Sequence, residues 1–245
     1  MKSNMRGIIL SGGSGTRLRP LTKITSKQLL PVYNRPMIYY PLNTLIKAGI
    51  TEIMIIIAPE RAGDYLNLLG SGQQFGVKFT YEIQDKPEGI AQAFLIGENF
   101  IDNENVTLIL GDNIFEDDLS EGIQSFNSGA RIFAKQVPDP ERFGVVKFDS
   151  QGQAESIIEK PKDKISDYAV TGLYVYDHQV VRAAKEIKPS ARGELEITDV
   201  NNWYLAKGQL DVATVKGEWL DTGTFDSLLK AQQFAKDKMA DKMII

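Results

Sequence analysis

The sequence has no cysteine and only one histidine, His178. The absence of cysteine excludes a disulfide scaffold, a zinc ribbon and a thiol nucleophile. Lysine and arginine form no cluster and the net charge is −4, which excludes strong attraction of nucleic acid. No apolar run reaches the roughly 18 residues of a membrane helix, and the N-terminal run ends at Gly12, too early for a signal peptide. We therefore predict a soluble, cytoplasmic protein with neither nucleic acid nor a membrane as partner.

No repeat, low-complexity tract or linker divides the chain. Its 245 residues, 42% of them apolar, suffice for one sizeable hydrophobic core. The pattern nevertheless changes halfway. Strand-like runs alternate with helical periodicity in the first half, whereas strands follow one another at shorter spacing in the second. We predict a single domain, residues 1–245, with two subregions.

Continuous apolar runs such as IMIII indicate strands that are buried on both faces, which favours a mostly parallel sheet covered by helices. In the first half the predicted strands are 6–10, 52–58, 78–83 and 106–110, and the predicted helices are 36–48, beginning at a proline, and 91–100. In the second half the predicted strands are 130–136, 144–149, 154–159 and 169–176, and the predicted helices are 199–207 and 224–238. The fold class is therefore α/β with a mixed sheet.

The stretch IILSGGSGTRL, residues 8–18, sets an apolar run against a glycine-rich loop and an arginine. Glycines let main-chain N–H groups approach an anion closely, and a cation adds charge. A P-loop is excluded because the ending Gly-Lys-Ser/Thr is absent, and a dinucleotide fingerprint is excluded because Leu18 replaces its third glycine. A tight turn after a buried strand is the alternative. We expect a loop that binds a polyphosphate.

Two aspartates follow apolar runs, Asp112 in VTLILGDN and Asp221 in EWLDTGT. Ligands of open α/β sheets lie beyond the carboxyl ends of strands, and paired carboxylates suit Mg²⁺ bound to phosphates. An Asx turn explains Asp112 equally well, and a helix cap at Thr222 or Thr224 explains Asp221. An aspartic protease is excluded, because it needs two Asp-Thr-Gly loops in an all-β frame. Spacing alone does not show that the two aspartates meet.

Basic partners lie close to the glycine loop, in the segment GTRLRPLTKITSKQLLPV. Surface charge is the ordinary role of a lysine. Lys27, however, precedes the run QLLP, which has to fold inward and carries the lysine toward the loop. His178 belongs to a strand-to-helix turn and is not expected to be catalytic.

Many motifs occur together and in order. GGSGTRL is followed by SKQLLPV, PMIYYPL, QDKPEGIAQAF, LGDNIF, DPERFGVV, EKP, AVTGLYVYD, SARGELEITD and WLDTGT. Over residues 7–229 the chain thus resembles the glucose-1-phosphate thymidylyltransferase family of sugar-nucleotide pyrophosphorylases. The resemblance implies a Rossmann-like three-layer nucleotidyltransferase fold with a mixed, mostly parallel central sheet. It implies a nucleotide-binding subregion at about residues 5–130 and a sugar-binding subregion at about 131–230.

The resemblance implies an Mg²⁺-dependent reaction in which dTTP and glucose 1-phosphate give dTDP-glucose and pyrophosphate, for biosynthesis of deoxysugars of the dTDP-rhamnose type. A sugar 1-phosphate is already an anionic nucleophile, so the chemistry needs charge neutralisation rather than a serine, cysteine or histidine. A uridylyltransferase remains an alternative, because one methyl group is worth only roughly 1–3 kcal/mol in a pocket. A non-catalytic sugar-nucleotide sensor is the second alternative. A homo-oligomer, a tetramer or dimer, is also implied.

Site residues carry over from the family motif by motif. Arg17 and Lys27 match phosphate-binding and catalytic cations, and Asp112 and Asp221 match catalytic Mg²⁺ ligands. The positions that match nucleotide-binding residues are Leu10, Gly12, Gly13, Gly15, Thr16, Arg17, Lys27, Gln28, Gln84, Pro87, Gly89 and Asp112. Those that match the glucose pocket are Gly144, Glu159, Lys160 and Val170, with weaker matches at Arg192 and Thr198.

The residues taken alone leave other readings open. Gly144 also fits a β-bulge, and Glu159 with Lys160 fits an exposed ion pair at a strand end. A glutamine amide such as that of Gln84 can offer a donor and an acceptor to the edge of thymine or uracil. Trp219 lines the pocket or fills the core, and we expect the tyrosines at 39 and 40 to pack rather than stack on a base.

The sequence departs from the family in two places. It stops soon after the helix that follows WLDTGT, whereas many bacterial members continue through helices that help to form a regulatory site for the end-product sugar nucleotide. The segment VKGEW before that motif is also short. The resemblance therefore does not extend to feedback inhibition at that site.

Overall fold

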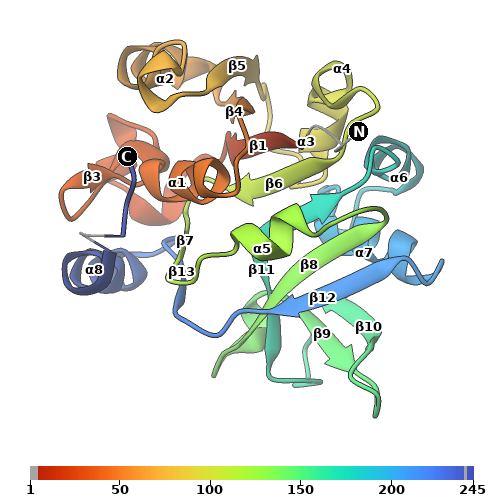
Figure 1. The fold of residues 1–245 in the computed structure, drawn as a ribbon. Coiled ribbons are helices and arrows are strands. Elements are labelled where there is room, and N and C mark those ends of the chain that lie inside the picture. The colour runs from red at the N-terminus through yellow and green to blue at the C-terminus, as the bar shows by residue number, and fades with distance from the viewer. Residues whose placement is uncertain (1–4, 240–241) are drawn as a thin grey trace.

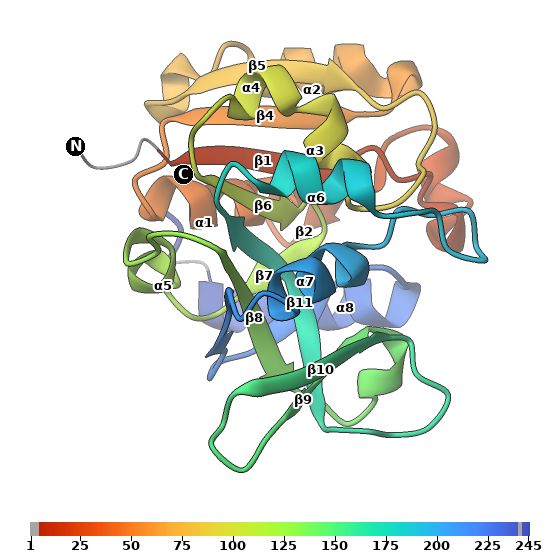
Figure 2. The same cartoon turned by 90° about the vertical axis from the view of Figure 1, so that its right-hand side faces the viewer.

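The computed structural model describes residues 5–239 and 242–245. Within these residues a nine-stranded mixed sheet has the order β10-β9-β11-β6-β1-β4-β5, and β8 pairs with both β11 and β12. Its strands are β1 (Arg6–Ser11), β4 (Glu52–Ile57), β5 (Lys78–Ile83), β6 (Val106–Leu110), β8 (Ala130–Gln136), β9 (Gly144–Phe148), β10 (Ala154–Glu159), β11 (Tyr168–Tyr176) and β12 (Leu210–Thr214). Helices cover the sheet on both faces (Figures 1 and 2), which confirms the predicted three-layer α/β fold.

The strands β6, β1, β4 and β5 run parallel to one another. Ile8 on β1 stands opposite Met54 on β4 and Leu108 on β6. Successive side chains of β1 alternate between the two faces, so that Ile8 and the next residue, Ile9, enter different apolar clusters. Because the carboxyl ends of parallel strands meet at one edge of the sheet, the loops after β1, β5 and β6 gather there.

One helical layer packs on the Ile8 face and consists of α3 (Gln92–Ile96), α4 (Glu98–Ile101), α6 (Val180–Glu186) and α7 (Ile197–Leu205). The other layer packs on the Ile9 face and consists of α1 (Tyr39–Lys47), α2 (Ala62–Leu69) and α5 (Ser120–Gln124). Figure 2 shows α3, α6 and α7 in front of the strands. A third apolar cluster lies under α8 (Phe225–Phe234). In the part of the chain that the structure describes, every helix is too short or too polar to cross a membrane.

β11 connects the parallel and antiparallel parts of the sheet. Its final residues, Leu173 to Tyr176, pair with β6, whereas its first residues, Tyr168 and Ala169, pair with β9. The register with β8 shifts between Val170 and Tyr174. Because β6 ends while β11 continues, the middle of β11 borders open space beyond the end of β6, and a cavity lies there.

Two predicted helix boundaries are wrong. Pro36 does not begin a helix but lies in a two-residue strand, β3 (Arg35–Pro36), opposite β2 (Pro31–Val32). Backbone hydrogen bonds from Met37 N to Leu30 O and from Ile38 N to Gln28 O hold this segment extended, so α1 begins only at Tyr39. The helix predicted over 91–100 is interrupted at Gly97, where a Cβ would lie 2.5 Å from Met54 Cε.

Several elements escaped prediction: α2, α5 and β12, together with β7 (Asn113–Phe115) and β13 (Trp219–Asp221), whereas α6 follows the strand-to-helix turn expected at His178. Strands of three residues carry too little periodicity to be recognised in a sequence. At the last helix, Thr224 forms a capping box with Ser227, and α8 gives way to a π-helical turn, Ala235–Met239. The cap is therefore Thr224 and not Thr222.

Candidate active site

The glycine loop, residues 12–15, follows β1 and enters a 3-10 turn, Thr16–Leu18, which is anchored by the fully buried Leu18. Gly15 has a φ of 60°, and its carbonyl accepts a hydrogen bond of 2.8 Å from Thr22 Oγ1. A Cβ on Gly13 would meet nothing within 4 Å, so the main chain is open to a ligand there. The loop thus presents bare backbone on its outer side, as anion binding requires.

Lys27 lies under this loop. It begins the 3-10 turn Lys27–Leu29, and the next residue, Gln28, is buried, which confirms the predicted inward fold of the segment. Lys27 Cβ is 3.3 Å from the position of a Cβ on Gly15. The Lys27 ammonium donates to Asp112 Oδ2 in an ion pair whose side chains are 11% and 14% exposed. Lys27 is therefore not a solvated surface charge.

Asn113 orients Asp112. Asn113 Oδ1 accepts hydrogen bonds from Gly172 N (3.0 Å) and from Trp219 Nε1 (2.6 Å), both of which can only donate. Asn113 Nδ2 therefore faces the other way, where it donates to Asp112 Oδ1 at 3.0 Å. Both carboxylate oxygens of Asp112 are thus held by side chains, and the Asx-turn reading is wrong. Asn113 was not singled out from the sequence, where the motif LGDN offered the only signal.

The structure brings Asp221 beside Asp112, which the spacing in the sequence did not show. β13 pairs with β7 in antiparallel register, and Asp221 stands opposite Asn113. The next residue, Thr222, donates to the Asp112 carbonyl oxygen from both its backbone N (3.1 Å) and its Oγ1 (2.8 Å). Thr222 thus ties together two segments 110 positions apart in the chain.

The two carboxyl groups have opposite pKa shifts. Burial opposes ionisation of Asp112, but the charge and hydrogen bond of Lys27, with a further hydrogen bond from Asn113, outweigh it and lower the pKa of Asp112. For Asp221, burial and then the negative charge of Asp112 raise the pKa to about 6, against the smaller effects of Lys27, Arg17 and Arg142. Within the part of the chain that the structure describes, Asp221 forms no ion pair like the one between Asp112 and Lys27.

This donor set fits a divalent cation that is shared with a bound polyanion. Two buried carboxylates that repel one another gain from a cation between them, and Lys27 already supplies positive charge to one of them. Among residues 5–239 and 242–245 no cluster of three or more histidine, cysteine, aspartate or glutamate side chains is arranged to hold a metal. The remaining ligands would therefore come from substrate phosphates and water.

A cavity of about 270 Å³ opens beside the two aspartates, between the end of β6 and strands β9, β10 and β11. It is lined by Arg17, Asp112 and Asp221 on one side. All four residues predicted for the sugar pocket, Gly144, Glu159, Lys160 and Val170, line the same cavity, together with Thr198. Arg192 does not line it, but its Nη2 lies 3.3 Å from Glu159 Oε1.

Hydrogen bonds fix Glu159 at the wall of the cavity. Its Oε2 accepts from Thr198 Oγ1 at 2.7 Å. Gly144 stands opposite Glu159 in regular register, and a Cβ there would lie 3.0 Å from Thr198 Oγ1. The irregularity of this hairpin lies between Ala154 and Ser156, so the bulge reading for Gly144 is wrong.

Lys160 partly fits the alternative of an exposed ion pair with Glu159 at the end of a strand. Its ammonium is 3.6 Å from Glu159 Oε1, and its side chain is half exposed. Its backbone, however, has a φ of 42°, which a residue with a side chain rarely adopts. That conformation follows directly after β10, where Lys160 N donates to Phe143 O at 3.0 Å.

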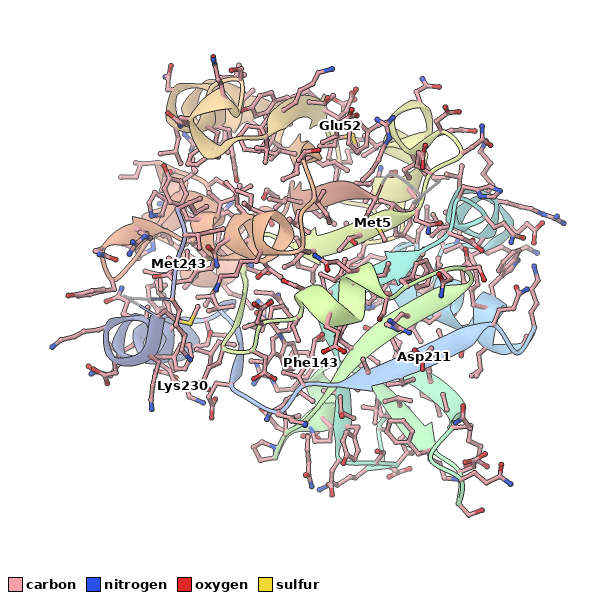
Figure 3. The ribbon with its side chains drawn as sticks, in the orientation of Figure 1. Met5, Glu52, Phe143, Asp211, Lys230 and Met243 are labelled. Carbon is pink, nitrogen blue, oxygen red and sulfur yellow. The ribbon has the colours of Figure 1, made fainter. Side chains whose placement is uncertain are left out.

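The lining includes Trp219, for which the sequence had left a pocket role open, and also Arg142 and Phe143, which the sequence did not single out. Trp219 packs against Phe143 with ring centroids 4.9 Å apart, and both rings border the cavity. Figure 3 places Phe143 in the lower half of the molecule, away from Glu52 at the start of β4. Arg142 borders the cavity as well and is paired with Asp139 at 2.6 Å. The motif DPERF contained both Arg142 and Phe143 but gave no ground to choose them.

The residues predicted near the nucleoside lie elsewhere, over the ends of β1 and β5. Gln84 follows β5 and is 3% exposed, and a Cβ on Gly12 would lie 2.0 Å from its Oε1. Gln28 is buried and accepts from Ser26 Oγ at 2.7 Å. Gly89 has a φ of 108° and touches the backbone of Leu195. Of the other predicted positions, Leu10 is half-buried and Thr16 and Pro87 are exposed.

A family model of nucleotidyl transferases matches residues 6–238. The chain is 54% identical over 244 residues to a glucose-1-phosphate thymidylyltransferase of Neisseria meningitidis, covering 95% of this chain and 83% of that protein. It is 53% identical over 237 residues to the protein of the same name in Mycobacterium tuberculosis, covering 95% of this chain and 82% of that protein.

Two solved structures resemble this one. A structure from Bacillus anthracis, described as a glucose-1-phosphate thymidylyltransferase in complex with sucrose, superimposes with a TM-score of 0.91 at 51% identity and covers 95% of this chain and 96% of its own. A UDP-glucose pyrophosphorylase complexed with UDP-glucose superimposes with a TM-score of 0.83 at 24% identity, covering 96% of this chain and 99% of its own. The second likeness is evidence of the fold alone.

Proposed function

We propose that this chain, which belongs to the nucleotidyl transferase family, transfers a thymidylyl group from dTTP to glucose 1-phosphate and releases pyrophosphate and dTDP-glucose. The observation that carries the proposal is the meeting of Asp112 and Asp221 between the open glycine loop and the cavity. A phosphoryl-transfer site needs such paired oxygen ligands where two polyanionic substrates approach each other.

In the proposed complex the two substrates occupy different places. The triphosphate lies along the glycine loop, where the backbone of Gly13 is open and Arg17 borders the cavity. Glucose 1-phosphate occupies the cavity, with its hydroxyls toward Glu159 and its phosphate toward Lys160 and the aspartates. The nucleoside extends the other way, toward Gln84 and Gly89 at the end of β5.

The reaction needs no general base from the protein. An ionised oxygen of the sugar phosphate attacks the α-phosphorus of dTTP, the bond from that phosphorus to the oxygen bridging the α- and β-phosphates breaks, and pyrophosphate leaves with the electron pair. Arg17 and Lys27 stabilise the negative charge that gathers on the α-phosphate and the leaving group. Lys27 acts by turning from Asp112 to the phosphate when the nucleotide binds.

Asp112 and Asp221 are the residues that would hold Mg²⁺. When bound, Mg²⁺ would neutralise phosphate oxygens and so favour both the approach of the nucleophile and the departure of pyrophosphate. We further propose that the enzyme works in the cytoplasm, where nucleotides and sugar phosphates are made, and that it is a homo-oligomer, which a sizing measurement tests.

The test is pyrophosphate release with Mg²⁺, crossing dTTP, UTP, CTP, ATP and GTP with the 1-phosphates of glucose, mannose, galactose and N-acetylglucosamine. We expect the fastest release with dTTP and glucose 1-phosphate. A UTP optimum would make the protein a uridylyltransferase, since the thymine methyl contributes only roughly 1–3 kcal/mol. No release from folded protein with any pair would favour the sugar-nucleotide sensor instead.

A further inference from the structure

Gln84 carries an unpaired oxygen in a nearly closed position. Its side chain is 3% exposed, and its Oε1 lies over the backbone of Gly12. Its Nε2 donates to Gln92 Oε1 at 2.6 Å, whereas no group among the described residues donates to its Oε1. Among the described residues this oxygen is not one of the buried polar atoms that lack a partner, so it stays accessible and can accept a hydrogen bond from a ligand.

The direction of the Gln84 amide follows from the donors around it, although its oxygen and nitrogen have almost the same shape. The main-chain N–H of Glu88 can only donate, and it points at Gln92 Oε1 across 3.0 Å. Gln92 Nε2 points the other way, to Glu88 Oε2 at 3.0 Å. The oxygen of Gln92 must therefore face Gln84, and Gln84 must donate to it from its Nε2.

The position of Gln84 in the sheet indicates which part of a bound nucleotide would face its Oε1. The cavity for the sugar lies beyond β6, the glycine loop follows β1, and Gln84 lies past both, at the end of β5. A nucleotide whose α-phosphate lies between the glycine loop and Asp112 would extend its base toward this end of the sheet. The unpaired oxygen therefore meets the edge of the base.

We infer that Gln92 is a positioning residue for base selection. It locks the amide of Gln84 so that an acceptor faces the nucleobase, which favours a pyrimidine with a protonated ring nitrogen. Thymine and uracil have an N–H at ring position 3, whereas cytosine has a bare nitrogen there that would oppose the Gln84 oxygen. The inference rests on the proposed function, and it concerns thymine against cytosine, not thymine against uracil.

The test compares kcat/KM for dTTP, dUTP and dCTP with glucose 1-phosphate in the wild type and in Gln92→Met. Methionine has nearly the same length and helix propensity but accepts hydrogen bonds only weakly, so Gln84 becomes free to flip. We expect the ratio of kcat/KM for dTTP to kcat/KM for dCTP to fall roughly tenfold or more. Once the Gln84 amide can flip, the bare ring nitrogen of cytosine no longer has to face an unpaired oxygen. The ratio of dTTP to dUTP should stay unchanged, since both bases carry the ring N–H.

Two further variants separate positioning from packing. Gln92→Glu combined with Glu88→Gln keeps an oxygen toward the main-chain N of position 88 and toward Gln84, while the second oxygen meets an amide rather than a carboxylate, so the pair should retain the selection against dCTP. Glu88→Ala removes the side chain that Gln92 Nε2 binds but leaves the main-chain N–H, so it should retain that selection too. Gln92→Ala carries the same prediction as Gln92→Met if the latter does not fold.

The inference is overturned if a folded Gln92→Met or Gln92→Ala keeps the dTTP to dCTP ratio within about twofold of the wild type. It is also overturned if both ratios change together, which would indicate general loosening of the site. Failure of the proposed function is distinct from either result, because it would already appear as a wild-type protein that does not use dTTP.

Discussion

Lys27 and Asp112, 85 positions apart in the sequence, form a largely buried ion pair directly beneath the glycine loop. The pair stores a cation beside the place where the triphosphate is expected, and it keeps Asp112 ionised although burial acts against ionisation. Asp221 has no comparable partner among the described residues, and its pKa is raised. The two aspartates therefore respond differently to substitution and to pH.

Lys27→Met removes the cation from this pair. We expect kcat to fall roughly 10²- to 10³-fold, because one preorganised charge at a phosphoryl-transfer site is worth about that much. Lys23→Met is the matched control, since Lys23 belongs to the same segment but is exposed. Steady-state rates with dTTP and glucose 1-phosphate measure the effect. Normal turnover of folded Lys27→Met would contradict a catalytic role for Lys27.

The raised pKa of Asp221 predicts how stability depends on pH in the absence of metal. The folded protein holds the Asp221 proton more tightly than the unfolded chain does, so ionised Asp221 destabilises the fold above about pH 6, and this effect disappears as the pH falls toward 4. At pH 8 in a chelator, the free energy of unfolding of Asp221→Asn should therefore exceed that of the wild type by on the order of 1–3 kcal/mol. The variant should accordingly unfold at a higher Tm.

The same comparison at pH 5 should show a smaller gap in Tm. Asp112 contributes with the opposite sign: its lowered pKa stabilises the fold above about pH 4, and this contribution is lost as the pH falls below that value. A gap between wild type and Asp221→Asn that stays constant from pH 5 to pH 8 would contradict the raised pKa.

Gly223→Ala tests the space beside Asp221. A Cβ at this position would lie 2.9 Å from Asp221 Oδ1 and 3.0 Å from Arg17 Nη2. Both are ends of flexible side chains, so we expect a folded protein in which these two groups are displaced and turnover falls roughly tenfold or more. Gly63→Ala is the control, because its Cβ would meet nothing within 4 Å, and alanine favours the helix α2. Equal rates for the two variants would refute the assigned crowding.

Glu159→Gln separates the two substrates. Glu159 borders the cavity and accepts a hydrogen bond from Thr198, so the variant should raise KM for glucose 1-phosphate roughly tenfold to a hundredfold. KM for dTTP should change little, because the nucleotide is proposed to lie on the other side of the aspartates. Glu155→Gln, on the same strand but half exposed and paired with Lys147, is the control. A parallel rise in both KM values would argue against a separate sugar pocket.

The sequence predicted the elements whose signal is local. Runs such as IMIII have no face that tolerates water, so β4 was recognised as a buried strand, and the glycine loop was recognised from its own residues. The pairing of β7 with β13 was not predictable, because each has three residues and the contact is non-local. Yet this pairing, together with the hydrogen bonds of Thr222, brings Asp221 to Asp112.

The positioning residues could not be predicted for a related reason. Three residues position others through side-chain hydrogen bonds: Asn113 binds Asp112, Thr222 binds the Asp112 carbonyl oxygen, and Gln92 binds Gln84. Their residue types are common in turns and at helix ends, so an ordinary structural role was the better interpretation of each residue before the structure was known. The hydrogen-bond partners were needed to assign them.

The most direct test of the account is the rate of pyrophosphate release from dTTP and glucose 1-phosphate by Asp112→Asn and Asp221→Asn, measured beside the wild type over a range of Mg²⁺ concentrations. Because we propose that both carboxylates hold the cation between the substrates, we predict that each folded variant loses orders of magnitude in turnover and that added Mg²⁺ does not restore it. A near-normal rate in either folded variant would contradict the metal role of that aspartate and the site built around the pair.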